Sequence, residues 1–373
     1  MLDKRHLRFP DLAFVFFLIV SGPNTALHMQ ARQASRSSDT QPGQEFQKNR
    51  AAAKRYLSEE KAALAIPFLE KAGAINGSDF DNGYDLAQAY KQTGQLEKAR
   101  AEASHLLTIR NTADVHSLIG GIETAAHSPN AAAAEYQIAA QMDPSEERIF
   151  DFGRSLIGFE SDADIRIFSY GVEKYPKSSI LRIGLGEAFD FHENYEKAAE
   201  VLGQALDIDP DDPRPIDFLG KLPVVSPETA KQIDQRFSQF LKTHPDNANA
   251  NYYLARDLLN PKTGAPSNED LFSGEQLLKT AIRLDPNMAD AYFEMGRLFE
   301  KKGQQKEAVI AYERAVRLSP DQEKYHYRLS FSYRVVGKTE KADEELRVFQ
   351  RLQSQHALDT PPKKHQTEGS DMR

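Results

Sequence analysis

Residues 289–322 read ADAYFEMGRLFEKKGQQKEAVIAYERAVRLSPDQ, a stretch of 34 residues that contains two helical patterns. Four residues at i, i+3, i+4 and i+7 share one face of the first pattern, which is typical of an amphipathic helix. These residues are Tyr292, Met295, Gly296 and Phe299. Gly303 interrupts the pattern, and Ala308, Tyr312 and Ala315 continue it on a second helix. The stretch therefore predicts two helices packed against each other through small residues.

The same pattern recurs along most of the chain. Small residues inside helical patterns are spaced by 33 to 35 residues, with one longer interval of 41. They are Ala53, Ala87, Gly120, Gly153, Gly186, Gly220, Ala255, Gly296 and Ser330. We expect nine units, which begin near residues 46, 80, 113, 146, 179, 213, 248, 289 and 323. A lone helical pair leaves apolar surface uncovered, so such units are stable only when stacked.

The best unit resembles a known repeat family. The spacing Tyr292-x2-Met295-Gly296-x2-Phe299, followed by Ala308-x3-Tyr312 and Pro320, is similar to the tetratricopeptide repeat (TPR). The resemblance implies an all-α fold, a right-handed α-α superhelix (solenoid) of about nine TPR-like helical hairpins. It also implies that the first helix of each unit lines a concave groove that binds protein or peptide partners.

The pattern divides the chain into segments. Pro223 should end the first helix of the sixth unit early and interrupt the stacking there. Extra residues in the seventh unit form either a tolerated surface loop or a flap that contacts a partner. The expected segments are a signal peptide (1–26), a disordered linker (27–45), repeats 1–5 (46–212), repeats 6–9 (213–356) with a loop insertion near 260–273, and a disordered tail (357–373).

The first residues have the layout of a signal peptide. Lys4, Arg5 and Arg8 precede an uncharged apolar run at residues 12–20. That run is too short to span about 30 Å of hydrocarbon, which takes about 20 residues. We therefore expect an exported protein that is periplasmic or secreted. The alternative is an uncleaved amphipathic or buried segment.

Composition excludes much chemistry. The chain has no cysteine, which removes disulfides, thiolate nucleophiles and cysteine-bound metals. The net charge of -8 argues against nucleic acid as a partner. The histidines lack the spacing of a helical zinc site, and no nucleophile elbow or phosphate-binding loop occurs. We therefore expect a protein that is not an enzyme, with no metal site and no small-molecule cofactor.

One stripe on the first helices is the candidate binding surface. An aromatic residue stands three positions before the small residue, and an arginine stands one or four positions after it. Aromatic residues and arginines together are common at protein-binding hot spots. The candidate partner-binding residues are Phe150, Arg154, Tyr252, Arg256, Phe293, Arg297, Tyr327 and Arg334. In the alternative interpretation, the aromatics pack against neighbouring helices and the arginines are merely solvated.

These features predict an exported, non-catalytic scaffold or adaptor that binds a protein or peptide partner in its concave groove. Peripheral association with envelope complexes is compatible with this prediction. The alternative function is a periplasmic component of envelope or polysaccharide biosynthesis whose aromatic groove holds a glycan.

Overall fold

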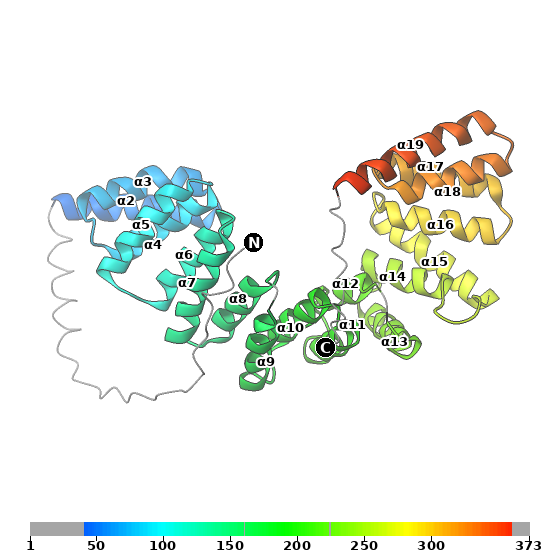
Figure 1. The fold of residues 1–373 in the computed structure, drawn as a ribbon. Helices are drawn as coiled ribbons and strands as arrows, with labels where there is room; N and C mark the ends of the chain where they lie inside the picture. The colour runs from blue at the N-terminus through cyan, green and yellow to red at the C-terminus, as the bar shows by residue number, and fades with distance from the viewer. Residues whose placement is uncertain (1–40, 160, 224, 360–373) are drawn as a thin grey trace, which may run out of the picture. The chain divides into compact units, whose positions relative to one another are not determined.

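The computed structural model describes residues 41–159, 161–223 and 225–359, and this part of the chain contains eighteen α-helices and no strand (Figure 1). The helices are α2 (Gln41–Ser58), α3 (Ala62–Ile75), α4 (Phe80–Gln92), α5 (Leu96–Ile109), α6 (Ala113–Ala125), α7 (Pro129–Met142), α8 (Glu146–Leu156), α9 (Ala163–Lys174), α10 (Ser179–Phe191), α11 (Tyr195–Ile208), α12 (Arg214–Lys221), α13 (Pro227–Thr243), α14 (Ala248–Leu259), α15 (Asn268–Leu284), α16 (Ala289–Lys301), α17 (Gln305–Leu318), α18 (Glu323–Val335) and α19 (Thr339–Asp359). The predicted all-α repeat class is confirmed.

The helices follow one another as nine pairs, and the predicted period places them well. From the second pair onward, each first helix begins within one residue of its expected start. Gly303 stands in the turn between α16 and α17 with a φ of 73°, a backbone conformation that glycine adopts without steric cost. The expected break at this glycine is therefore confirmed.

Both ends of the helical array extend beyond the predicted bounds. Helix α2 begins at Gln41, so residues 41–45 are helical and do not belong to a disordered linker. Helix α19 continues to Asp359, so residues 357–359 do not belong to a disordered tail. In each case the helix runs past the last residue that the repeat pattern could identify.

The predicted signal peptide at residues 1–26 lies outside the described residues, as do residues 27–40 and 360–373. Within the part that the structure describes, no helix combines the length and the apolar character needed to cross a membrane.

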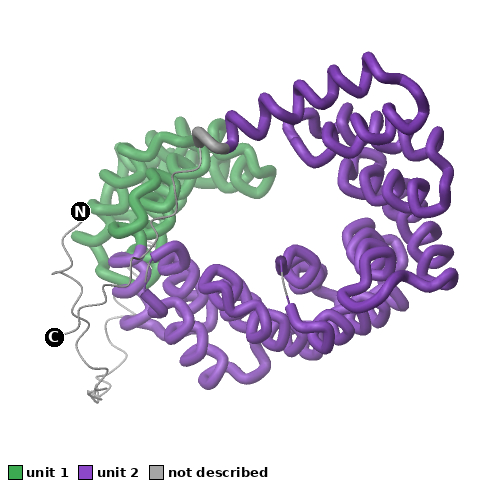
Figure 2. The backbone as a smooth tube through the Cα atoms, turned by 45° about the vertical axis from the view of Figure 1, so that its right-hand side comes forward, with its two compact units in different colours: residues 1–132 green, residues 133–373 purple. Residues whose placement is uncertain are grey.

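The chain forms two compact units, residues 1–132 and 133–373, with the boundary inside α7 (Figure 2). In the first unit, one apolar cluster runs through α2 to α6. Its fully buried members include Leu69, Leu106 and Ile122. Each helical pair in this unit therefore shares its core with the next pair, as stacking of repeats requires.

The second unit continues without a break at residues 212 and 213, where the sequence analysis expected one. Leu202 and Leu206 of α11 belong to the same apolar cluster as Ile216 and Leu219 of α12. This shared core joins the fifth and sixth repeats, so the expected separation of residues 46–212 from residues 213–356 is not seen.

The sixth repeat is nevertheless irregular, as Pro223 predicts. Helix α12 has eight residues and ends at Lys221, two residues before Pro223. Gly220 of α12 lies against the ring of Tyr253 of α14. The first helices of the sixth and seventh repeats are therefore in direct contact.

The insertion in the seventh repeat is shorter than expected. Helix α14 ends at Leu259 and α15 begins at Asn268, so the loop spans residues 260–267 instead of reaching residue 273. A capping box explains the early start of α15. The Ser267 hydroxyl accepts a bond from the Asp270 backbone N–H, and the Asp270 carboxylate accepts one from the Ser267 backbone N–H.

Small residues in the first helices let the paired helices approach closely. A methyl group built on Gly296 would lie 2.6 Å from Cε1 of Tyr312, whose ring is fully buried. A similar methyl group on Gly186 would lie 2.6 Å from Cγ of Leu202. A larger residue at these positions must displace a core side chain.

Replacing Gly296 by alanine should therefore destabilise the protein by about 1 to 3 kcal/mol, because the added methyl group overpacks the core against Tyr312. Gly203 in α11 is the matched control, since the nearest atom to its added methyl group is 3.5 Å away. Gly203→Ala should be neutral or stabilising because alanine favours helix. Urea unfolding of both variants measures the difference. Equal effects at the two positions would contradict the packing assignment.

Candidate protein-binding face of the second unit

All eight predicted site residues lie in the second unit, on four first helices. Phe150 and Arg154 are on α8, Tyr252 and Arg256 on α14, Phe293 and Arg297 on α16, and Tyr327 and Arg334 on α18. The four aromatic residues occupy equivalent positions of their repeats, as do Arg154, Arg256 and Arg297, whereas Arg334 lies one helical turn further along α18. The environments of the eight residues differ.

The aromatic residues are mostly packing residues. Phe293 is 7% exposed, and its ring centroid lies 5.5 Å from that of Tyr312 and 4.9 Å from that of Tyr325. The assignment of Phe293 as a partner-binding residue is therefore wrong, because the next repeat covers it. Phe150 is half-buried with its ring centroid 6.0 Å from that of Phe168.

Tyr252 is half-buried against the apolar clusters on both of its sides. Burial and the nearby carboxylates of Asp290 and Glu294 raise the pKa of its hydroxyl. Tyr327 differs from the other three aromatics, since it is 50% exposed and contacts Phe349 of α19. Only this member of the aromatic set presents a large open surface.

Arg256 links two repeats. Its Nη1 donates a 2.7 Å bond to the carbonyl of Gly220 in α12, and its Nε donates a 2.8 Å bond to Asp257. The guanidinium also lies 5.3 Å from the centre of the Tyr253 ring. Arg256 therefore holds α14 against α12 and is not a free donor for a partner.

The other three arginines differ in their ion pairs and in the exposure of their side chains. Arg297 donates through Nη1 to Glu294, 3.0 Å away, and its side chain is 29% exposed. Arg334 pairs with Asp343 of α19 at 3.0 Å, with both side chains more than half exposed. Arg154 is exposed on α8. The guanidinium of Arg297 is therefore held in place by Glu294, whereas the side chains of Arg334 and Arg154 are more exposed to solvent.

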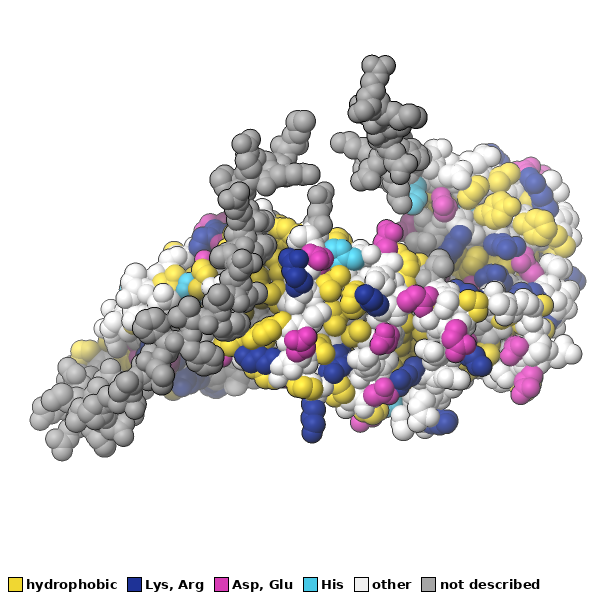
Figure 3. All heavy atoms as spheres, turned by 60° about the horizontal axis from the view of Figure 1, so that its bottom comes forward, with side chains coloured by type: hydrophobic (Ala, Val, Ile, Leu, Met, Phe, Trp, Pro, Cys, Tyr) yellow, Lys and Arg dark blue, Asp and Glu magenta, His cyan; other side chains and the backbone are white. Residues whose placement is uncertain are grey.

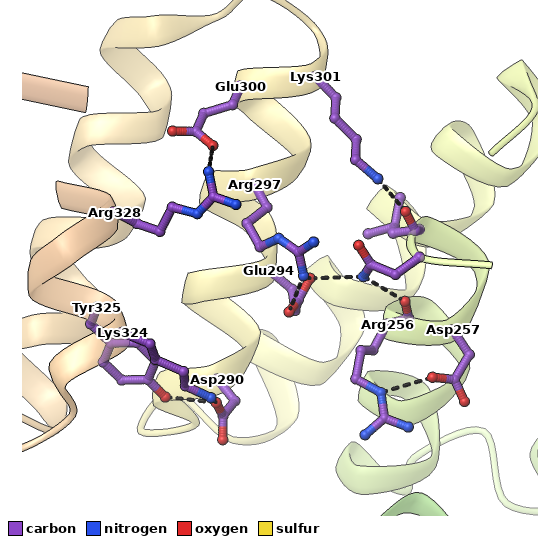
Figure 4. Close-up of polar contacts among 12 residues, drawn as sticks. Arg256, Asp257, Asp290, Glu294, Arg297, Glu300, Lys301, Lys324, Tyr325 and Arg328 are labelled. Atoms are coloured by element: carbon purple, nitrogen blue, oxygen red, sulfur yellow. Dashed lines mark hydrogen bonds and ion pairs between the residues drawn. The ribbon is translucent and has the colours of Figure 1, made fainter. Parts of the chain in front are cut away.

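Acidic residues on α16 complete a ladder of polar contacts between α14, α16 and α18 (Figure 4). Asn260 donates to Glu294 at 3.1 Å, and Lys301 donates to the carbonyl of Leu259. These contacts tie α16 to the end of α14.

On the other side of α16, Asp290 accepts a 2.9 Å bond from Lys324 and a 2.7 Å bond from the hydroxyl of Tyr325. Glu300 accepts a 2.8 Å bond from Ser332 and lies 3.7 Å from Arg328. The seventh, eighth and ninth repeats are thus joined through charged groups as well as through their cores.

The pKa of Asp290 reflects the hydrogen bonds that its carboxylate accepts from Lys324 and Tyr325. Burial alone would raise the pKa of the carboxyl, but the bonds from Lys324 and Tyr325 outweigh burial and hold it below the ordinary value. Burial, together with the charge of Arg297, lowers the pKa of the Lys301 ammonium. The ladder is therefore a set of ordered charges.

Asp234 on α13 is a half-buried carboxyl close to Arg256 and Asp257. Burial and the charge of Asp257 raise its pKa to about 7, and its Oδ1 is buried without a hydrogen-bond partner among the described residues. Arg256 and Lys262 act in the opposite direction. Asp234 is thus a group beside Arg256 that can lose its negative charge near neutral pH.

The acidic members of the ladder are not among the candidate residues that the sequence pattern predicts. Asp290 and Lys324 are 34 residues apart, so they occupy the same position in successive repeats and carry opposite charges. Comparing charges between equivalent positions could have identified this pair. Among the residues that the structure describes, no group of three histidine or carboxylate side chains is arranged to hold a metal ion.

Replacing Arg256 by alanine should lower the stability by about 1 to 3 kcal/mol, because the carbonyl of Gly220 and the carboxylate of Asp257 lose a donor. Arg334→Ala is the matched control. It removes an exposed ion pair and should change the stability by no more than about 0.5 kcal/mol. Thermal unfolding compares the two. An unchanged melting temperature for the Arg256 variant would show that the contact with α12 is not stabilising.

Comparisons with known proteins agree with the repeat assignment. One family model described as tetratricopeptide repeat matches residues 56–122, and another matches residues 181–212 and 289–322. No curated protein matches the chain significantly.

Several solved structures are similar in part. YrrB, described as a TPR protein with an unusual peptide-binding site, is 23% identical, with 44% of this chain and 87% of YrrB covered and a TM-score of 0.38. MamA is 18% identical, with 47% of this chain and 97% of MamA covered and a TM-score of 0.38. A tetratricopeptide repeat protein from Parabacteroides merdae is 12% identical, with 78% of this chain and 99% of that protein covered and a TM-score of 0.47. The family matches, together with the helical pairs at the matched residues, show that the chain contains tetratricopeptide repeats.

Proposed function

We propose that this repeat scaffold is non-catalytic and that the first helices of its second unit bind a segment of another protein. The observation that carries the proposal is the ladder of ordered charges on α14, α16 and α18. Arg297 is its key member, because Glu294 fixes the guanidinium while 29% of the side chain is exposed. A donor that is already ordered loses little conformational entropy when a partner binds.

The charged character of this face favours a polypeptide over a glycan. A neutral polysaccharide would stack on a row of exposed aromatic rings. On α14, α16 and α18, however, the rings that are open to half their extent are Tyr327 and Phe331, both on α18, while Phe293 is 7% exposed. A polypeptide segment offers carbonyls and carboxylates, which match the forked N–H groups of arginine. The glycan alternative therefore has weaker support.

The surface charges also fit a protein partner. On the face drawn in Figure 3, basic and acidic side chains are interspersed and are not gathered by sign. Nucleic-acid binding depends on clustered positive charge. The helices of the described residues all belong to repeats, so this part of the chain has no separate domain for catalysis.

A substitution at Arg297 tests the proposal. Arg297→Lys keeps a positive charge beside Glu294 but removes the planar fork, so it should weaken binding of peptides selected on an array by wild-type protein by about fivefold or more. The matched control is Arg236→Lys, which changes an arginine paired with Asp207 on the second helices.

Affinity is measured at low and high salt, and the melting temperature checks the fold. Peptide affinity should fall as salt rises, because exposed charges are screened. Equal affinities for the Arg297 variant and wild type would contradict the proposal. Salt-insensitive binding of a neutral polysaccharide in the same assay would favour the glycan alternative.

We also propose that the chain is exported to the periplasm or beyond the cell, where it associates with envelope proteins. Support comes from Lys4, Arg5 and Arg8 ahead of the apolar run at residues 12–20. A reporter enzyme that works only outside the cytoplasm, fused after Arg373, should be active. The mature protein should begin near Leu27 by amino-terminal sequencing. Full-length protein retained in the cytoplasm would contradict export.

A further inference from the structure

His326 of α18 is a buried histidine that lies between two hydrogen-bond acceptors. It is 4% exposed. Its Nδ1 is 2.5 Å from Oε2 of Glu345 on α19, and its Nε2 is 2.9 Å from the carbonyl oxygen of Pro320 in the turn before α18. We call these three residues the histidine clasp. The clasp joins the last helix, α19, to both α18 and the turn that leads into it.

The two contacts of the clasp fix the number of protons that it holds. A carbonyl oxygen and an ionised carboxylate have no proton to give, and a neutral imidazole carries a single N–H. A neutral ring can therefore donate to only one of the two acceptors. Both contacts form when one more proton is present, whether that proton lies on Nδ1 of His326 or on the Glu345 side of the short contact. Closing the clasp therefore takes up a proton at alkaline pH.

The groups around His326 favour its charged form. Burial and the charge of Arg351 on α19 lower the pKa of the imidazole, but Glu345 and the Pro320 carbonyl outweigh them and hold it above the ordinary value. On α18 itself, Glu323 lies one turn before His326 on the same face. Three carboxylates of α16 and α17 that contact α18 are engaged by other side chains, namely Asp290 by Lys324, Glu300 by Arg328 and Glu313 by Tyr333.

Helix α19 depends on such polar contacts because its apolar packing is limited. Ala342 is fully buried, whereas the larger apolar residues of the helix are only half-buried, namely Leu346, Val348, Phe349 and Leu352. The ion pair between Arg334 and Asp343 is exposed, and such pairs contribute little to stability. The histidine clasp is thus a buried polar link in a part of the fold with little buried apolar surface.

Two candidate partner-binding residues lie against the helix that the clasp holds. The ring centroid of Tyr327 is 5.2 Å from that of Phe349, and Arg334 is 3.0 Å from Asp343. Any loosening of α19 therefore changes the surroundings of both candidate residues.

We infer that the histidine clasp is a pH-sensitive device that holds α19 on α18 while His326 is protonated and loosens this helix at alkaline pH. The inference goes beyond the proposed function and does not depend on which partner binds. The stabilisation is complete below the ordinary histidine pKa of about 6.5 and is lost as the pH rises through the raised pKa of His326.

Two measurements on the full chain test the inference. Histidine-labelled protein followed by NMR should show that His326 titrates above about pH 6.5. Hydrogen exchange, corrected for the intrinsic rate at each pH, should show that the protection of α19 falls between about pH 6 and about pH 9. The fall should be about tenfold for each unit by which the pKa of His326 exceeds the ordinary value. Amides of α4 in the first unit are the internal reference.

Either of two results would overturn the inference. One is titration of His326 at or below the ordinary value, and the other is protection of α19 that stays constant over this pH range.

A substitution in the clasp identifies the sensor. Glu345→Gln places an amide N–H opposite Nδ1, so a neutral ring can accept there while Nε2 donates to Pro320. The protection of α19 should then lose most of its pH dependence. His326→Gln removes the titrating ring and should have the same result. Wild-type pH dependence in both variants would contradict the inference, because another group would then be the sensor.

The matched control is His105→Gln. His105 is exposed in the first unit, and its Nε2 lies 3.0 Å from one acceptor, the carbonyl of Gly77, which a neutral ring can satisfy. This variant should keep the wild-type pH dependence of α19. Loss of that dependence in the control would show that the effect does not arise from the clasp.

Discussion

The stack of repeats depends on a close contact between a glycine of the first helix and a large side chain of its partner helix, which the fourth, fifth and eighth repeats share. In the eighth repeat the contact joins Gly296 and Tyr312, and in the fifth it joins Gly186 and Leu202. Both pairs are 16 residues apart, which corresponds to one helix, a short turn and the start of the next helix. Because the glycine has no side chain, the two helix axes can approach until the large residue fills the gap. The helical pair then acts as one building block, and the next block covers the apolar surface that remains on it.

This constraint explains why the sequence predicts the fold so well. The starts of the second to ninth pairs follow from a period of small residues, and Gly303 marks a turn that needs a positive φ. The errors occur where the pattern has no repeat beyond it. Helix α2 begins five residues before residue 46, and α19 runs three residues past residue 356. At those ends, helix length depends on local propensity and capping and no longer on the repeating core. The expected break near residue 212 failed for another reason: Pro223 shortens α12, but the core between α11 and α12 is continuous.

The candidate site is harder to predict because a residue at one of its positions can either face a partner or pack against the next repeat. The residue three before the small residue lies between the binding face and the next repeat, so its burial depends on whether another helix packs beyond it. Phe293 is covered by α18, whereas the equivalent Tyr327 is open. Sequence shows an aromatic residue in both places and cannot show which one has a neighbour. The arginines have the same ambiguity. Arg256 donates to the carbonyl of Gly220 in α12, the first helix of the preceding repeat. Its role therefore depends on a contact with a helix that the sequence of α14 does not reveal.

The polar ladder holds the charged side chains of the candidate face in fixed positions. Apolar packing alone would stack the repeats, but the first helices would then offer a partner only flexible side chains. Asp290 instead accepts bonds from Lys324 and Tyr325, and Glu294 holds Arg297. Each charge is balanced by a neighbour, so the face has ordered groups without a large net charge that would repel the next repeat. Partner discrimination can then arise from which N–H groups still point outward. In the last described repeat, Lys324, Arg328 and Arg334 of α18 are paired in the same way with Asp290, Glu300 and Asp343. Beside these pairs the rings of Tyr327 and Phe331 are half exposed, which distinguishes this repeat from the eighth.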